Sequence, residues 1–197
     1  GIPFRFRDLG FSTSPWLRRH HEIRKILTFF ETESDDSESE EQQDEYAAKV
    51  NSSMMFWGPK GTGKTAIAAA FLRQLITNLG EAGYFRTVPN LLSELRGTFG
   101  GDGNEWELIQ KYCETSILVL DDLGAEHISG SGWAEDRLYQ VIGNRHDEER
   151  QTVFTSNLSM VDLGKRLGDR IVWRIVEMCG EHIYKVDGPN LRDRTER

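Results

Sequence analysis

The sequence predicts an α/β protein in which helices flank a parallel β-sheet. Short unbroken apolar runs, typical of strands that are buried on both faces, occur at Ser53–Trp57 and Ile117–Leu120. Segments with helical periodicity separate such runs, and a glycine-rich turn, Gly58–Thr65, joins the first run to a helical segment. The length of 197 residues suits one domain with a core of its own.

The other elements continue this alternation. Further strands are expected at Tyr84–Val88, Thr152–Thr155 and Ile183–Val186. Helices are expected at Ala66–Leu79, from an Asn90 cap to Leu95, and at Trp106–Tyr112, Glu135–Arg145, Asp162–Leu167 and Ile171–Met178.

Composition divides the chain into three parts. Residues 1–30 are mildly basic and form an N-terminal segment with a helical pattern at Leu17–Phe30. The tract Glu31–Glu45 holds nine acidic residues and no Lys or Arg, and we expect it to be a disordered insertion. Residues 46–197 carry the α/β pattern and form the expected catalytic core.

The acidic tract carries the whole negative balance of the protein. The net charge is -8, from 24 basic and 32 acidic residues. Outside the tract 23 acidic residues face the 24 basic ones, so the overall charge does not exclude nucleic-acid binding.

Nothing in the sequence indicates a membrane span or secretion. It has no apolar run of about 18 residues and no signal-peptide pattern, so we expect a cytoplasmic protein. Cys113 and Cys179 fit neither a disulfide framework nor a metal cluster, and reduced thiols are expected. Because the chain begins with Gly1, we expect a fragment or a processed chain.

The glycine-rich turn matches the phosphate-binding motif G-x-x-x-x-G-K-[ST]. Glycines allow successive N–H groups to point inward at an anion, and the helix that follows adds its positive end. Lys64 is expected to reach the β- and γ-phosphates of a nucleotide, and the Thr65 hydroxyl to ligate Mg²⁺. A surface turn is the alternative, but the strand before and the helix after disfavour it. The motif comprises Gly58, Pro59, Lys60, Gly61, Thr62, Gly63, Lys64 and Thr65.

Two aspartates follow the apolar run at Ile117–Leu120. Carboxylates at the end of a central strand lie beside the phosphate-binding loop in such a sheet. We expect Asp121 to orient Mg²⁺ and Asp122 to be the base that polarises the attacking water. The alternative is a pair of solvated turn aspartates, which the spacing from Thr65 disfavours.

Three other side chains are weaker candidates. Asn157 follows the strand at Thr152–Thr155 and could hold the lytic water, or it could only cap the next helix. Arg170 and Arg174 lie four residues apart on one helix, so they share a face that suits a phosphate. A surface salt-bridge face with Asp169 and Glu177 is the alternative for these arginines.

Together these motifs resemble the AAA+ ATPases. Within them the chain is similar to the bacterial replicative helicase loaders of the DnaC/DnaI type, with the IstB transposition helpers close by. The likeness spans most of the chain, through Ile2–Asp8, Gly58–Thr65, Val119–Glu126, Trp133, Glu135, Leu138–Tyr139, Ile142–Arg145, Thr155–Leu158, Leu167–Arg174 and Gly188–Arg192.

The resemblance implies roles for these residues. Gly58–Thr65 would be Walker A, Asp121 and Asp122 Walker B, and Asn157 sensor 1. Arg170 and Arg174 would lie on the arginine-finger helix, with Arg170 favoured as the finger, and Arg192 would be near sensor 2. Only 19 residues follow Met178, so we expect a reduced or absent C-terminal lid.

The resemblance also implies a function. A self-associating, Mg²⁺-dependent ATPase, with the ATP site at the subunit interface, would load a replicative DNA helicase onto single-stranded DNA as replication begins. The alternative in the same class is an IstB-like transposition helper. A regulator that barely hydrolyses ATP is disfavoured by the complete acidic pair. A small-molecule kinase is disfavoured because no second phosphate site is evident.

Overall fold

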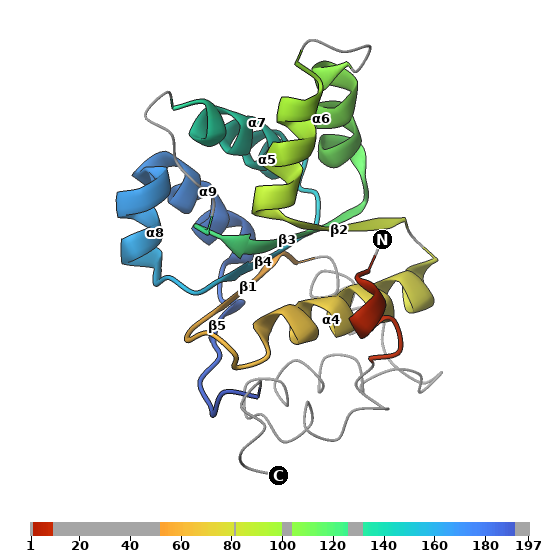
Figure 1. Ribbon diagram of the computed structural model, residues 1–197, viewed down its shortest axis with the longest axis vertical. Helices are drawn as coiled ribbons and strands as arrows, with labels where there is room; N and C mark the ends of the chain where they lie inside the picture. The colour runs from red at the N-terminus through yellow and green to blue at the C-terminus, as the bar shows by residue number, and fades with distance from the viewer. Residues whose placement is uncertain (1, 10–51, 81, 100–103, 126–131, 192–197) are drawn as a thin grey trace, which may run out of the picture.

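The computed structural model describes residues 2–9, 52–80, 82–99, 104–125 and 132–191. Its five strands form one parallel sheet in the order β2-β3-β4-β1-β5, which confirms the expected fold class (Figure 1). The strands are β1 (Met54–Trp57), β2 (Gly83–Thr87), β3 (Ile117–Leu123), β4 (Thr152–Ser156) and β5 (Ile183–Lys185). Because β4 lies between β3 and β1, its last residues come between the aspartates and the glycine-rich loop.

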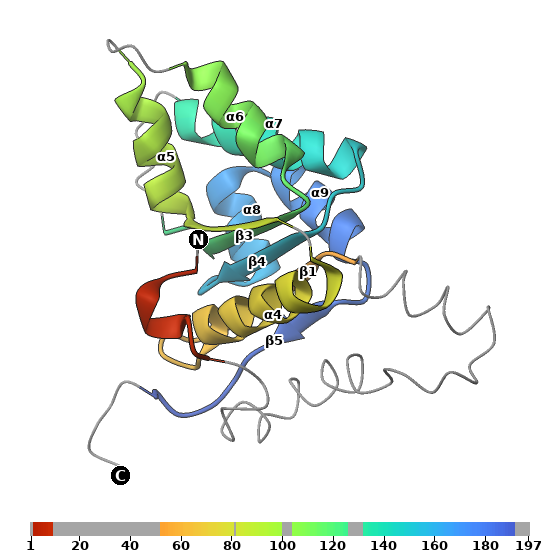
Figure 2. The ribbon, with the colours of Figure 1, turned by 90° about the vertical axis from the view of Figure 1, so that its right-hand side faces the viewer.

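Helices cover both faces of this sheet (Figures 1 and 2). On one face α4 (Lys64–Leu79) packs together with the short 3-10 helix η1 (Phe4–Phe6). The opposite face carries α5 (Val88–Gly97), α6 (Glu105–Glu114), α7 (Trp133–Asp147), α8 (Met160–Leu167) and α9 (Asp169–Cys179).

Alternation along the strands supplies the two halves of the core. Met54 and Phe56 of β1 pack with α4, whereas Met55 packs on the opposite side with α5, α7 and α9. All three side chains are fully buried. This double burial explains why the strands are unbroken apolar runs in the sequence.

Several element boundaries differ from the expectation. β2 ends at Thr87, whose side chain caps α5 by accepting the Asn90 N–H, so Asn90 is not the cap itself. Val88 is the first residue of that helix. β3 continues beyond Leu120 to Leu123, so both aspartates lie within the strand. Thr87 prevails as the cap because Pro89, at the second helical position, needs no hydrogen-bond acceptor.

Arg145 of α7 is a fully buried cation in the core, held by hydrogen bonds rather than by a carboxylate. Its Nε donates to Thr152 Oγ1 at 2.8 Å. Its two Nη atoms donate to five carbonyl groups at the end of α6 and the start of β4, namely those of Tyr112, Cys113, Thr115, Ser116 and Gln151. Burial lowers the pKa of this guanidinium to about 9. Arg145 of α7 therefore connects α6 and β4 at the amino-terminal end of the strands. The site described below lies at the opposite, carboxyl-terminal end.

Some expectations lie outside the described residues. These are the helix at Leu17–Phe30, the acidic tract Glu31–Glu45 and Arg192. The described residues that follow β5, 186–191, form no helix. Among the described helices, none has the length and apolar character needed to cross a membrane. Cys113 and Cys179 are both buried as free thiols.

Candidate functional site

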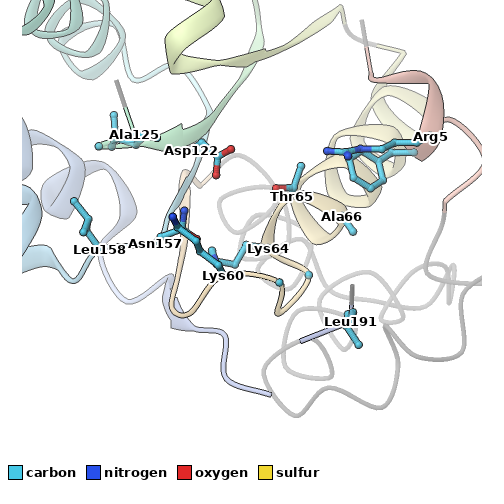
Figure 3. A pocket seen from close by; sticks show the side chains of 15 residues that line it. Arg5, Lys60, Lys64, Thr65, Ala66, Asp122, Ala125, Asn157, Leu158 and Leu191 are labelled. Atoms are coloured by element: carbon cyan, nitrogen blue, oxygen red, sulfur yellow. The ribbon is translucent and has the colours of Figure 1, made fainter. Parts of the chain in front are cut away.

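A pocket of about 640 Å³ opens at the carboxyl ends of the parallel strands (Figure 3). Its lining brings together seven of the fourteen residues that the sequence singled out. From the glycine-rich loop and α4 come Lys60, Gly61, Gly63, Lys64, Thr65 and Ala66, and opposite them lie Asp122 and Asn157. Ligands bind at this end of the strands in open α/β sheets.

The glycine-rich loop has the backbone that an anion nest requires. Gly61 and Gly63 have φ values of 84° and 100°, in the left-handed region that glycine adopts without strain, and α4 begins directly after Gly63. Lys64 is buried, and its Nζ donates to the carbonyl oxygens of Gly58 at 2.8 Å and Pro59 at 2.6 Å. Thr62 Oγ1 also donates to the Pro59 carbonyl. These hydrogen bonds hold the loop together internally. The start of α4, which is the positive end of the helix dipole, lies at the pocket.

A β-bulge in β3 separates the two aspartates. Leu120 pairs with Phe154 and Leu123 with Ser156, so one extra residue of β3 is accommodated at Asp121–Asp122. Asp122 adopts a positive φ of 58°, a conformation that Asp tolerates better than most residues. Asp121 is buried, with 2% of its surface exposed, whereas Asp122 lines the pocket. Adjacent carboxylates thereby reach different environments.

Thr155 of β4 connects these two aspartates, and it was not among the site residues predicted from the sequence. Its buried hydroxyl donates to Asp121 Oδ1 at 2.7 Å and accepts the Asp122 N–H at 2.9 Å. The next residue, Ser156, donates to the Leu123 carbonyl at 2.6 Å and accepts the Leu158 N–H. The only signal in the sequence was the run of hydroxyl side chains before Asn157.

Asp121 lies in an environment that opposes its ionisation. Burial, with a smaller contribution from the neighbouring charge of Asp122, raises the pKa of its carboxyl group from 3.8 to about 6. Hydrogen bonds from Thr155 and Thr65 and the positive charge of Arg5 act in the opposite direction. Asp121 therefore sits at the base of the site, next to the first turn of α4.

The oxygen donors at the base of the site fit a hard divalent cation. The Thr65 hydroxyl hydrogen-bonds to the Asp121 carboxylate, and Asp122 follows on the pocket wall. Hydroxyl and carboxylate oxygens beside a phosphate-binding loop are the ligands that Mg²⁺ takes in nucleotide sites. A cation bound here would also compensate the charge of the buried Asp121 carboxylate, which burial disfavours.

Arg170 and Arg174 do not line the pocket of their own chain. Both guanidinium groups lie over the ring of Tyr139 on α7, with Cζ 5.3 Å and 4.4 Å from its centroid. The expected ion pairs with Asp169 and Glu177 are not among the ion pairs of the described residues. Glu177 pairs instead with His146, at 3.0 Å. The salt-bridge alternative for the two arginines therefore gains no support.

Residues near both ends of the described chain line the pocket, a feature that the sequence did not predict. Arg5 and Phe6 of η1 line one side, and Leu191 lines it near the other end of the chain (Figure 3). The Leu191 N–H donates to the Gly61 carbonyl at 3.0 Å. The alternating Phe and Arg residues at positions 4–7 were a possible signal, but their place beside α4 depends on tertiary packing.

Known proteins resemble this chain in sequence and in fold. A family model described as IstB-like ATP binding protein matches residues 29–197. The replicative helicase loader DnaC of Buchnera aphidicola subsp. Baizongia pistaciae is 32% identical over 136 residues, which cover 66% of this chain and 54% of that protein. DnaC of Escherichia coli K12 is 29% identical over 124 residues, 62% of this chain and 49% of that protein. The chain thus spans about half the length of these relatives.

Solved structures show the same fold. A crystal structure of the DnaC helicase loader has a TM-score of 0.73 at 23% identity, covering 94% of this chain and all of that one. A crystal structure of DnaI has a TM-score of 0.61 at 24% identity, covering 82% of this chain and 89% of that one. With a matched phosphate-binding loop, a strand-borne acidic pair and a family model over most of its length, the chain belongs to the family of IstB-like ATP-binding proteins and has the AAA+ fold.

Proposed function

We propose that this protein is a Mg²⁺-dependent AAA+ ATPase that loads a replicative DNA helicase onto single-stranded DNA at the start of replication, in the cytoplasm. The observation that carries the catalytic part is the linkage of Thr65, Asp121, Thr155 and Asp122 around one pocket. The curated relatives named as replicative helicase loaders favour this partner.

The residues of the pocket divide the work of hydrolysis. Loop N–H groups and Lys64 would bind the phosphates, and Thr65 with Asp121 would hold Mg²⁺, which neutralises charge on them. Asp122, on the pocket wall, would accept a proton from the attacking water. Asn157 reaches the pocket from the end of β4 and would orient that water.

Charge that builds on the γ-phosphoryl oxygens in the transition state calls for an arginine in addition to Lys64 and Mg²⁺. Arg170 and Arg174 do not line the pocket of their own chain, so we propose that they act in the pocket of a neighbouring subunit, with Arg170 favoured as the finger. Arg192 stays a candidate for sensor 2. Turnover would then require assembly. The arginine supplied by the neighbour would accelerate hydrolysis by roughly 10³- to 10⁵-fold.

Two substitutions test the catalytic part. Lys64→Ala is expected to abolish nucleotide binding because the phosphates lose their main counter-charge. Asp122→Asn is expected to bind ATP normally and hydrolyse it at least about 100-fold more slowly. Fluorescent-nucleotide titration and phosphate release measure the two effects. Hydrolysis by Asp122→Asn at the parent rate would exclude Asp122 as the base.

The partner is tested separately. The full-length protein is expected to retain the replicative helicase of its host in a pull-down, and its ATP turnover to respond to single-stranded DNA. Retention of a transposase instead would favour the second candidate, a transposition helper, which the family description supports. Turnover that depends on a metabolite and not on DNA would contradict both.

A further inference from the structure

We propose that Tyr139 is a positioning residue, which holds Arg170 and Arg174 in the orientation that presents them to the nucleotide of a neighbouring subunit. This inference rests on the proposed function, in which α9 supplies an arginine to the next copy. The relevant features are the aromatic ring on α7, the two guanidinium groups over it, and the lack of any described carboxylate paired with them.

The Tyr139 ring serves both arginines at once. It lies half-buried on α7, with Arg174 Cζ 4.4 Å and Arg170 Cζ 5.3 Å from its centroid. The arginines are one helical turn apart on α9, which packs against α7. A cation over an aromatic face is attracted by about 0.5–2 kcal/mol, depending on how far it is desolvated. One ring therefore fixes the direction of two flexible side chains.

Arg174 is held closely against α7 by a second feature. Gly143 lies one turn after Tyr139 on that helix, and a Cβ atom added there would come within 3.3 Å of Arg174 Nε. This Nε is buried and has no hydrogen-bond partner in the described part of the chain. The position of Arg174 thus depends on packing against Gly143 and the Tyr139 ring. Arg170, by contrast, is exposed.

An aromatic ring is better suited than a carboxylate to orient an arginine finger. A carboxylate would orient an arginine but would also neutralise it and occupy its donors in a bidentate fork. A ring contacts only the face of the guanidinium, so the N–H groups at its edge stay directed at other acceptors. The nearby carboxylate of Glu177 is engaged by His146 instead. The cluster thus orients positive charge without cancelling it.

Mixing of inactive subunits provides the test. Asp122→Asn gives a subunit that binds ATP and has intact arginines, and Arg170→Ala/Arg174→Ala gives one with an intact pocket and no fingers. Turnover in the mixture comes only from arginines of the first subunit in the pocket of the second. Adding Tyr139→Leu to the first subunit is expected to lower this turnover roughly 10- to 100-fold, the scale of a misplaced catalytic group.

Two controls separate positioning from general stability. Adding Tyr139→Phe to the first subunit is expected to keep turnover within about twofold, because the ring face that attracts the cations remains. Moving Tyr139→Leu to the second subunit is expected to leave turnover unchanged, because that subunit contributes no arginine. Melting temperatures and gel filtration of every variant report on folding and assembly.

The outcomes discriminate this inference from the proposed function. If the original mixture shows no turnover while the parent hydrolyses ATP, the fingers do not act between subunits and the proposed function fails at that point. If the mixture is active and Tyr139→Leu has no effect in either subunit, the positioning role of Tyr139 is overturned. An equal loss in both subunits would also overturn it, because a general structural role predicts that symmetry.

Discussion

Thr155 Oγ1 donates a hydrogen bond to Asp121 Oδ1 at 2.7 Å, and the same oxygen accepts the N–H of Asp122 at 2.9 Å. One buried hydroxyl on β4 thereby sets the position of both aspartates on β3. It occupies one lone pair of the Asp121 carboxylate and stabilises the bulge that turns Asp122 toward the pocket. These two bonds tie β4 to the pair of aspartates that we propose for catalysis.

Replacing Thr155 by Val keeps the side-chain shape and removes both hydrogen bonds. We expect turnover to fall roughly 10- to 100-fold, because Asp122 loses its fixed position, and stability to fall by about 1–3 kcal/mol, because a buried N–H is left unpaired. Steady-state hydrolysis and urea denaturation measure these effects. Thr155→Ser, which keeps the hydroxyl, should stay close to the parent; equal losses in both variants would contradict the hydrogen-bond explanation.

Asp121→Asn is expected to stabilise the metal-free protein while abolishing Mg²⁺-dependent turnover. The pKa of Asp121 is raised from 3.8 to about 6, so between these pH values the folded chain retains a proton that the unfolded chain releases. Unfolding free energy therefore falls as pH rises through this window, by roughly 2–3 kcal/mol in total. Asp121→Asn has no carboxyl group to ionise at this position, so its unfolding free energy does not fall in this window.

Denaturation in EDTA at a series of pH values checks this prediction. The stability advantage of Asp121→Asn should be largest near pH 8 and vanish well below pH 3.8, where the parent carboxyl is protonated in both states. A constant difference across the whole range would show that the substitution acts by packing and not by removing a charge.

Arg145→Met is expected to destabilise the fold by about 3–5 kcal/mol without direct effect on the pocket. Five carbonyl groups and the Thr152 hydroxyl lose their donor, and a methionine of similar length cannot replace any of these bonds. Chemical denaturation gives the size of the effect. Arg150→Met is the matched control, since the partly exposed Arg150 side chain makes one hydrogen bond to the described residues, to the Glu114 carbonyl, and its loss should change stability by less than about 1 kcal/mol.

Deleting Glu31–Glu45 is expected to leave the melting temperature and ATP turnover unchanged, because the tract has almost no apolar residues to bury. Non-specific DNA binding at low salt should tighten, since the deletion removes nine acidic groups that repel phosphates. A variant of equal length with the acids replaced by Gln and Ser separates charge from length. A large fall in melting temperature on deletion would instead mean that the tract is structured.

Residue type and spacing alone are enough to predict the local features of this protein. Gly61 and Gly63 predict a loop that curls around an anion, and the apolar run that ends at Asp121 predicts a central parallel strand. These features depend on neighbours within a few residues, so spacing and residue type are enough to predict them. Each lies at the pocket or beside it in the structure.

How distant residues combine depends on strand order and packing across the whole domain. The strand order places β4 between β3 and β1, which brings Thr155 to the aspartates although 33 and 34 residues separate them in sequence. The bulge that sends Asp121 and Asp122 apart depends on register with that strand. Packing of α9 on α7 places Arg174 over Tyr139 and leaves no ion pair with Glu177 among the described residues. Such contacts are selected by burial and strand pairing across the whole domain, which no local spacing encodes.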